Sequence, residues 1–326
     1  GNTIKRGSSM PAPGTSPAPH AHSSEEIKKH VNIPVATVAR INEPWIAEEL
    51  IANEKCDMCM IGRPNLCDSE FANKAFEGKV DDIRPCIGCG RCLTGIMMGK
   101  RISCTVNPSV EDDTIAPAET KKKVLVIGGG PAGMEAAYVA RKRGHEVVLC
   151  EKSNELGGQL RLAAVPIAKQ ELCKVIKFMI RRLDHEGIEV RLNTEVTKEM
   201  LENEFKDYEI VCSSGATPKE IPPFKVFKNW MTADDVLSGK KYPGRNIVVL
   251  GGGSVGCETA DYLAPLINDL FPMNRKITLL EMTNNLMPGE GGAAKSRLTQ
   301  RLMQKGVRIE LNAQVTNVDE ESITYV

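Results

Sequence analysis

The sequence has few aromatic residues, no net charge and no long hydrophobic run, and each of these absences excludes a class of function. Aromatic residues make up 4% of the 326 positions, which argues against a surface that stacks on sugars or RNA bases. The 42 Lys and Arg residues are balanced by 42 Asp and Glu residues, so nothing favours a nucleic-acid or anionic-membrane partner. No apolar run approaches the roughly 20 residues that span a bilayer.

The first ten residues, GNTIKRGSSM, begin with Gly and lack the hydrophobic segment of a signal peptide. We therefore expect a cytoplasmic fragment of a longer protein. The eleven cysteines are an odd number, and without an export signal clustered cysteines more often bind metal or carry out redox chemistry than form disulfides. A homo-oligomer is compatible with these features.

The order of the predicted elements indicates an α/β protein with parallel sheets. A strand, a helix and a strand are predicted over 31–41, 43–54 and 56–64, and the charged segment EDDTIAPAETKKK (111–123) marks a domain boundary. Strand–turn–helix–strand units follow from 123 and from 246. Four domains are predicted, at residues 1–80, 81–118, 119–230 and 231–326.

The first glycine fingerprint, Gly128-x-Gly130-x-x-Gly133, lies between an apolar strand and a helix. Its glycines allow a tight turn, close approach of a pyrophosphate and close helix–strand packing, and the helix N-terminus attracts phosphate. Glu151 ends the next strand, where a carboxylate can bind the ribose hydroxyls. A lone fingerprint is weak, since a glycine-rich turn without a ligand has the same pattern, but this context predicts dinucleotide binding.

The second fingerprint, Gly251-x-Gly253-x-x-Gly256, again lies between a strand and a helix, and Glu281 ends the following strand. An acid at this position favours NADH, because it repels the 2′-phosphate of NADPH. The nearby Arg275 and Lys276 weaken that preference. Two fingerprints in one chain predict FAD and NAD(H), with hydride passing from the nicotinamide to the flavin.

Two further segments resemble the flavoprotein pyridine-nucleotide oxidoreductases. NELGGQL (154–160) is similar to the segment that follows the FAD fingerprint there, and CSSGATPKEIP (212–222) is similar to the crossover between the two domains. Disulfide reductases of this fold carry a closely spaced dithiol beside the flavin. The cysteines of this half, at 150, 173, 212 and 257, have no such spacing, so a dithiol outlet for electrons is not expected.

The segment RPCIGCGRCLTGIMMGKRISC (84–104) contains Cys86, Cys89, Cys92 and Cys104. Zinc prefers two separated Cys-x2-Cys turns, whereas three cysteines within seven residues suit a [4Fe–4S] cluster, in which each thiolate binds a different iron. The spacing alone leaves cluster, zinc or no metal open. The flavin module downstream favours the cluster, because a flavin can split a hydride pair into single electrons. The pattern Cys56-x2-Cys59…Cys67 is not interpreted as a second metal site, because Cys56 and Cys59 lie on or beside a predicted buried strand.

Cluster segment, FAD fingerprint and NAD fingerprint, in this order, resemble the multidomain branch of the old yellow enzyme family. That branch includes bacterial 2,4-dienoyl-CoA reductase, clostridial enoate reductases and trimethylamine dehydrogenase. The resemblance covers about residues 25–326 and is strongest in three stretches besides the glycine units: IPVATVARINEPWIAEELI (33–51), IGRPNLCDSEFANKAFEGKVDDIRPCIGC (61–89) and ISCTVNPSV (102–110).

The resemblance implies that residues 31–66 are the last two strands of an FMN-binding (β/α)8 barrel, with Arg40, Gly62 and Arg63 at the FMN phosphate. It implies electron flow from NADH to FAD, to the cluster, to FMN and then to the C=C bond of an unsaturated acid or thioester. A barrel needs about 200 residues, so the substrate-binding and catalytic residues are expected outside this chain, which should hold FMN weakly or not at all. An amine dehydrogenase of the same build and a stand-alone electron-transfer module remain alternatives.

The residues predicted to bind metal are the four cysteines of 84–104. The residues predicted to bind FAD, NAD(H) or FMN are Gly128, Gly130, Pro131, Ala132, Gly133, Glu151, Lys152, Gly158, Gln159, Val196, Gly215, Gly251, Gly253, Ser254, Gly256, Glu281, Arg40, Gly62 and Arg63.

Overall fold

The computed structural model describes residues 11, 14–112, 114–219, 222–264, 275–290 and 292–326. The chain divides into two compact units. The first extends to Ala164 and includes Lys169–Gly215, and the second consists of Val165–Ala168 and Ala216–Val326. The predicted boundaries at residues 80, 118 and 230 divide the chain more finely and stay predictions.

The first unit opens with a strand–helix–strand segment followed by short helices. Its elements in chain order are α1 (Ala21–Lys28), β1 (Ala36–Val38), α2 (Pro44–Ala52), β2 (Met58–Met60), α3 (Arg63–Cys67), α4 (Phe71–Phe76), the 3-10 helix η1 (Val80–Asp82) and α5 (Arg91–Met97). β1 and β2 pair in parallel. Ile46 and Leu50, four residues apart on α2, face the same small core.

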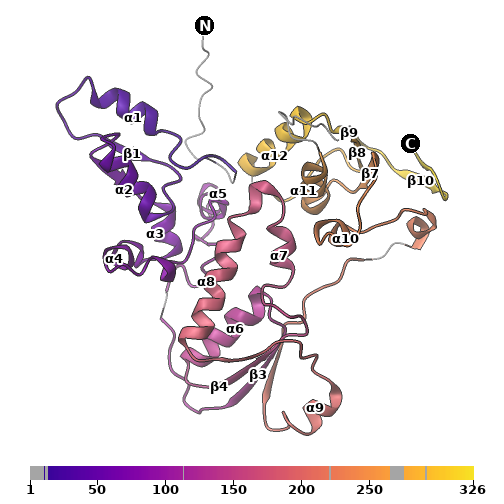
Figure 1. Cartoon of the computed structure of the whole chain (residues 1–326), viewed down its shortest axis with the longest axis horizontal. Coiled ribbons are helices and arrows are strands. Elements are labelled where there is room, and N and C mark those ends of the chain that lie inside the picture. The colour runs from indigo at the N-terminus through magenta and orange to yellow at the C-terminus, as the bar shows by residue number, and fades with distance from the viewer. Residues whose placement is uncertain (1–10, 12–13, 113, 220–221, 265–274, 291) are drawn as a thin grey trace. The chain divides into compact units, whose positions relative to one another are not determined.

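The rest of the first unit is a parallel sheet with helices. Its elements are β3 (Lys123–Ile127), α6 (Pro131–Lys142), β4 (Glu146–Cys150), α7 (Gln159–Ala163), α8 (Leu172–His185), β5 (Glu189–Arg191), α9 (Lys198–Glu202) and β6 (Glu209–Cys212). The strand order is β5-β4-β3-β6, and each pair is parallel. α6 packs on β3 and β4 and against α8 (Figure 1). The apolar core beneath these helices includes Met134, Leu149 and Leu183.

The second unit repeats the strand–helix pattern around a smaller parallel sheet. The 3-10 helix η2 (Ile167–Lys169) spans a boundary between the units along the chain, and the elements of the second unit are η3 (Pro222–Val226), α10 (Ala233–Leu237), β7 (Asn246–Leu250), α11 (Ser254–Leu263), β8 (Lys276–Glu281), α12 (Gly292–Gln304), β9 (Arg308–Leu311), β10 (Val315–Val318) and β11 (Ile323–Tyr325). The described sheet has the order β7-β8-β9, and β10 and β11 form an antiparallel pair. Its core includes Leu279 and Leu302, both fully buried.

Helix α8 and the residue before it connect the N-terminal segment to the first sheet. Glu171 Oε1 accepts a hydrogen bond from Arg40 Nη2 at 2.6 Å, and Asp82 Oδ1 accepts one from Arg181 Nε at 2.6 Å. Lys174 forms a third ion pair, with Glu43. Ile87, which lies between Cys86 and Cys89, and Val106, which lies two residues after Cys104, pack against the same apolar core as α8. The cysteine segment therefore belongs to the same compact unit as the first sheet.

The predicted α/β class with parallel sheets is confirmed. The strand predicted over 31–41 is shorter, because Pro34 lacks a donor for the ladder and Ala39 and Arg40 have positive φ angles of 85° and 48°. Among the described residues, no helix combines the length and the apolar character needed to cross a membrane.

Candidate functional site

The first fingerprint turn is closed by backbone contacts that admit no side chain. Gly128 donates its amide to the carbonyl of Cys150 at 2.8 Å, and Met134 donates to the carbonyl of Gly130 at 2.9 Å as α6 begins. A Cβ atom on Gly133 would lie 1.8 Å from the carbonyl oxygen of Gly128. The backbone amides at the start of α6 are therefore held at the end of β3, where a pyrophosphate would sit.

Glu151, at the end of β4, is bound to this turn by its carboxylate. Its Oε2 accepts from the Gly129 amide at 2.6 Å, and its Oε1 accepts from the amide and hydroxyl of Ser153 at 2.8 and 2.7 Å. Burial by itself would raise the pKa of Glu151, but the hydrogen bonds from Ser153 and Gly129 outweigh it and lower the pKa below its usual value. The carboxylate is thus fixed in its charged form beside the turn.

Other predicted FAD contacts surround the same turn or lie further off. A Cβ on Gly158 would lie 3.0 Å from the Cα of Gly130, so the segment before α7 passes directly over the turn. Pro131 is the first residue of α6, and Gln159 is the first residue of α7. Ala132, Lys152 and Gly215 are exposed, and Val196 packs beside the core formed by Leu125 and Phe205.

The second fingerprint repeats this geometry in the second unit. Gly251 donates to the carbonyl of Leu280 at 2.9 Å, and a Cβ on Gly256 would lie 1.9 Å from the carbonyl oxygen of Gly251. Glu281 Oε2 accepts from the Gly252 amide at 2.6 Å. Its Oε1 accepts from the amide of Thr283 at 2.8 Å.

Electrostatics and the helix start of the second site also match the first. Burial would raise the pKa of Glu281, yet the bonds from Thr283 and Gly252 bring it below the usual value. Gly253 immediately precedes α11, and Ser254, the first residue of α11, donates its hydroxyl to Glu290 at 2.7 Å. The structure therefore brings the predicted NAD(H) residues of this unit together at one strand–helix turn.

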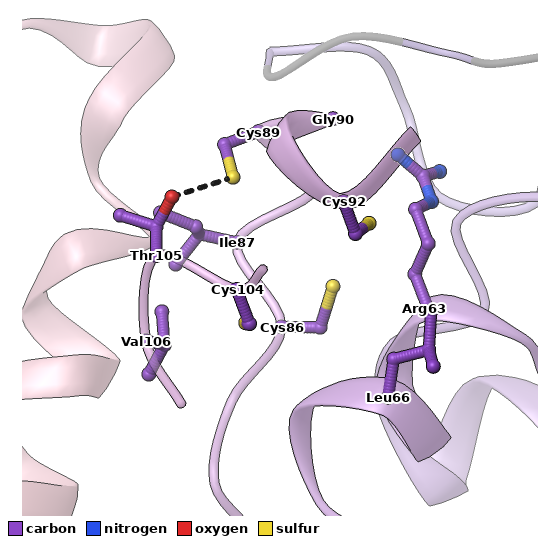
Figure 2. A pocket seen from close by; sticks show the side chains of 10 residues that line it. All are labelled: Arg63, Leu66, Cys86, Ile87, Cys89, Gly90, Cys92, Cys104, Thr105 and Val106. Carbon is purple, nitrogen blue, oxygen red and sulfur yellow. Dashed lines mark hydrogen bonds between the residues drawn. The ribbon is translucent and has the colours of Figure 1, made fainter. Parts of the chain in front are cut away.

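The four predicted metal ligands line one pocket in the first unit (Figure 2). Cys86 and Cys89 precede α5, Cys92 lies in its first turn, and Cys104 follows it. Gly90, with a φ of 78°, allows the loop to turn into the helix. Cys89 Sγ lies 3.2 Å from the hydroxyl of Thr105.

Backbone amides point at the sulfur atoms of this pocket. The amide of Gly88 donates to Cys86, that of Leu93 to Cys92, and those of Val106 and Asn107 to Cys104. Burial nevertheless raises the pKa of Cys86 to about 11. Thiols that are partly desolvated and surrounded by N–H donors suit a metal, because the metal replaces the thiol protons and the donors stabilise the thiolates.

The residues predicted at the FMN phosphate lie beside the cysteine loop. Arg40 is 6% exposed and binds Glu171, and a Cβ on Gly88 would lie 2.5 Å from its Nη1. Arg63 Nη1 donates to the carbonyl oxygens of Gly88 and Pro11, each at 3.3 Å. Gly62 immediately precedes α3. Both guanidinium groups are thus engaged with the protein, and their part in FMN binding stays a prediction.

Comparison with known proteins places this geometry in a family. Residues 122–326 match the family described as pyridine nucleotide-disulphide oxidoreductase. The chain belongs to this family. The match implies FAD and NAD(H) as cofactors, in agreement with the prediction from the two fingerprints.

Curated relatives of this oxidoreductase extend the match to the N-terminal segment. The NADH oxidase of Thermoanaerobacter brockii is 38% identical over 319 residues, which is 93% of this chain and 47% of that protein. The cinnamate reductase of Clostridium sporogenes is 37% identical over 268 residues, covering 81% of this chain and 39% of that protein. The chain therefore spans about half the length of the curated relatives it matches.

A solved structure of a 2-naphthoyl-CoA reductase in complex with 2-naphthoyl-CoA matches 96% of this chain with a TM-score of 0.89 and 27% identity, and the match covers 48% of that chain. Together with the curated relatives it confirms the predicted membership of the multidomain old yellow enzyme family.

Sequence reasoning missed two contacts of the oxidoreductase's nucleotide sites. Gly129 and Gly252, the middle residues of the two Gly-Gly-Gly runs, donate to the strand-end acids. A Cβ at either position would lie within 2.5 Å of a leucine side chain, that of Leu156 or Leu286. The signal is present, since both fingerprints read Gly-Gly-Gly where the general pattern tolerates any residue in the middle.

Sequence reasoning also missed the contact that Cys67 makes. Cys56 and Cys59, the other two thiols of that group, have sulfur atoms 3.8 Å apart beside the core of the N-terminal segment. Cys67 is instead fully buried at the end of α3, and its thiol hydrogen-bonds the sulfur of Cys104. Spacing along the chain could not reveal this contact, because 36 residues and two α-helices intervene.

Proposed function

We propose that this chain is the electron-input part of an NADH-dependent flavin and iron–sulfur oxidoreductase whose complete form reduces the activated C=C bond of an enoate or enoyl-CoA. When bound, the cofactors would supply a path from NADH to FAD, to a [4Fe–4S] cluster and to FMN. The observation that carries this proposal is the pocket of four cysteines in the same compact unit as the first fingerprint. Two of the relatives are named for the reduction of unsaturated acids or thioesters.

The sequence pattern, with three of the four cysteines within seven residues, favours a cluster over a single zinc ion. Within the described part of the chain, no three His, Cys, Asp or Glu side chains are placed to hold one metal ion. The four cysteines nevertheless line one pocket. Zinc requires four ligand atoms around one point at about 2.3 Å for sulfur, whereas a four-iron cluster takes one thiolate on each iron and so needs wider spacing.

The residues of the chain would give the two nucleotides different roles. In the first unit, the amides at the start of α6 would bind the FAD pyrophosphate, and Glu151 would accept from the ribose. In the second unit, Glu281 would select NADH by repelling the 2′-phosphate of NADPH. Its carboxylate is already held at that position by Gly252 and Thr283.

The test begins with the chain purified without oxygen. We expect about four iron and four sulfide per chain and a visible absorption that dithionite bleaches. Cys89→Ser and Cys92→Ser should each lose most of the iron, whereas the control Cys56→Ser, a buried thiol outside the pocket, should keep it. Stoichiometric zinc without iron in the unaltered chain would contradict the cluster.

A second experiment tests the route from the nicotinamide. With FAD bound, NADH should bleach both the flavin and the cluster. Gly256→Ala should abolish bleaching by NADH and leave bleaching by dithionite intact, because the substitution lies in the second unit. Bleaching of the cluster by NADH in a preparation that has lost FAD would contradict the proposed order of cofactors.

A further inference from the structure

Glu290 places a carboxylate at the start of α11, where the second nucleotide site is predicted to hold a pyrophosphate. Its Oε1 accepts from the hydroxyl of Ser254, the first residue of α11, at 2.7 Å. A helix N-terminus attracts anions, because its first amides lack partners within the helix and the helix dipole is positive there. A carboxylate and a pyrophosphate therefore suit the same place, and they carry charge of the same sign.

The segment that carries Glu290 is anchored to the fingerprint turn just before that residue. Leu286 and Met287 are 5% and 2% exposed, and Met287 donates its amide to the carbonyl of Gly252 at 2.8 Å. Glu290 in turn donates its own amide to the carbonyl of Met287 at 3.2 Å. The carboxylate thus reaches α11 from a short turn whose base is buried against the nucleotide site.

Gly289 lies between this buried base and Glu290 and gives the turn a point at which it can move. Its φ is 88°, and a Cβ there would meet no described atom within 4 Å. Glycine adopts φ of either sign at little cost. Glu290 itself is exposed. Rotation at Gly289 can therefore carry the carboxylate away from Ser254 without disturbing the buried base.

The first unit has a different residue at the equivalent place. In both units, the leucine that lies against the middle glycine of the turn is five residues after the strand-end acid. Four residues further on, the first unit has Leu160 and the second has Glu290. A strand-end acid, a glycine turn and a covering leucine thus form in the first unit without this carboxylate, so the turn itself does not require it.

We propose that Glu290 is an autoinhibitory residue whose carboxylate takes the place of the NAD(H) pyrophosphate at the start of α11 and must move aside before the coenzyme binds. This inference rests on the proposed function, because it takes the second fingerprint as the NADH site. The contact weakens nucleotide binding and has no part in hydride transfer. It acts against ligands that carry a pyrophosphate at this place, and a nucleoside without phosphate is unaffected.

The first experiment titrates the full chain, with FAD bound, with ADP-ribose, which contains the pyrophosphate of NADH and does not reduce the flavin. The variants are Glu290→Gln, Glu290→Ala and, as the matched control, Glu320→Gln, which removes an exposed negative charge from the turn between β10 and β11 of the same unit. Calorimetry should show about threefold to tenfold tighter binding in both Glu290 variants, because a like charge is removed, and unaltered affinity in the control. Adenosine, which has no phosphate, should bind all four proteins equally.

The second experiment mixes the same proteins rapidly with NADH and follows bleaching of the flavin. The NADH concentration that gives half of the limiting rate should fall in Glu290→Gln by the factor seen with ADP-ribose. The limiting rate should stay unchanged, because Glu290 has moved aside before hydride transfer. A lowered limiting rate would place Glu290 in the transfer step and overturn the autoinhibitory role.

The outcomes separate this inference from the proposed function. If Glu290→Gln and the control bound ADP-ribose with equal affinity, or if adenosine gained as much as ADP-ribose, the inference would be wrong while the NADH site remained. If ADP-ribose bound to none of the four proteins and NADH bleached none of them, the proposed function of the second unit would fail, and this inference with it.

Discussion

The two fingerprint turns are nearly the same structure built twice, and their difference lies in what covers them. In each, a strand-end Glu accepts from the middle glycine at 2.6 Å, and the third glycine meets the carbonyl of the first. In the first unit, however, a Cβ on Gly128 would lie 2.4 Å from the carbonyl oxygen of Ser213. Among the described residues, the equivalent Gly251 has no such neighbour within 4 Å.

The segment after β6 lies against the first turn, and the described part of the second sheet has no strand equivalent to β6. Residue 213 follows β6. In the first sheet β6 pairs with β3, so β3 is an inner strand, whereas the corresponding strand β7 lies at the edge of the described second sheet. The other neighbouring segment is common to both turns, since Gly157 donates to the carbonyl of Gly129 at 2.9 Å and Met287 donates to that of Gly252 at 2.8 Å. We expect the additional segment beside the first turn to slow the dissociation of a nucleotide bound there.

The largest loss of stability should come from the glycine–carbonyl contact that occurs once in each unit. Gly133→Ala and Gly256→Ala each force a Cβ into a backbone carbonyl, so each should destabilise its own unit by about 3 kcal/mol. Chemical denaturation, FAD content and reduction by NADH measure the result. The control Gly244→Ala, at an exposed position with open space for a Cβ, should be close to neutral. If both variants were as stable as the unaltered chain, the third glycine would not lie against the carbonyl of the first in either turn.

The next largest effect is a difference in stability loss between the first glycines of the two fingerprints. Gly128 and Gly251 have φ angles of 104° and 97°, so Ala is strained at both positions. Only Gly128→Ala also meets the Ser213 carbonyl, and it should therefore cost about 1–3 kcal/mol more than Gly251→Ala. Urea unfolding of the two variants gives the difference. Equal losses would mean that the segment after β6 does not cover the first turn.

A smaller effect is expected at the strand-end acids. Gly129 and Ser153 hydrogen-bond Glu151, and Gly252 and Thr283 hydrogen-bond Glu281 in the same pattern. Glu151→Gln and Glu281→Gln should therefore each destabilise their own unit by about 1 kcal/mol. Glu281→Gln should also raise the use of NADPH relative to NADH in steady-state kinetics. An unchanged coenzyme preference would remove Glu281 from NADH selection.

The smallest effect is a shared dependence on pH. The pKa of each acid is lowered by folding from a value near 4.5, so its contribution to stability is full above that pH. The contribution is lost as the pH falls through the folded-state pKa. Stability measured from about pH 6 to about pH 3 should fall less steeply in Glu151→Gln and Glu281→Gln than in the unaltered chain. A single flattened curve would show that only one unit has the described geometry.

Local sequence predicts the nucleotide turns well because their geometry is set within a few residues. Gly133 and Gly256 are required by contacts only five residues back in the chain, and the strand-end acids follow within one strand–helix–strand unit. The four cysteines are likewise recognisable because they lie within one window. Membership of the family follows from the order of these motifs.

Long-range contacts account for what the sequence could not predict. Cys67 reaches Cys104 only because α3 and the α5 loop are packed together, and Ser213 reaches Gly128 only because β6 pairs with β3. The ion pair between Arg40 and Glu171, which is 131 residues away, is likewise set by the fold. In each case the partner is chosen by packing, which no spacing along the chain encodes.

The ion pairs that Lys174 and Arg181 of α8 make affect what proteolysis of the chain would release. The stretch between Glu111 and Ala118 is mostly exposed where the structure describes it, and it looks like a place to separate the cysteine segment from the first sheet. Ion pairs with the α8 region and the packing of Ile87 and Val106 join the two sides independently of that stretch. A protease acting there would nick the backbone without releasing a piece, and the two fragments would purify together until denatured.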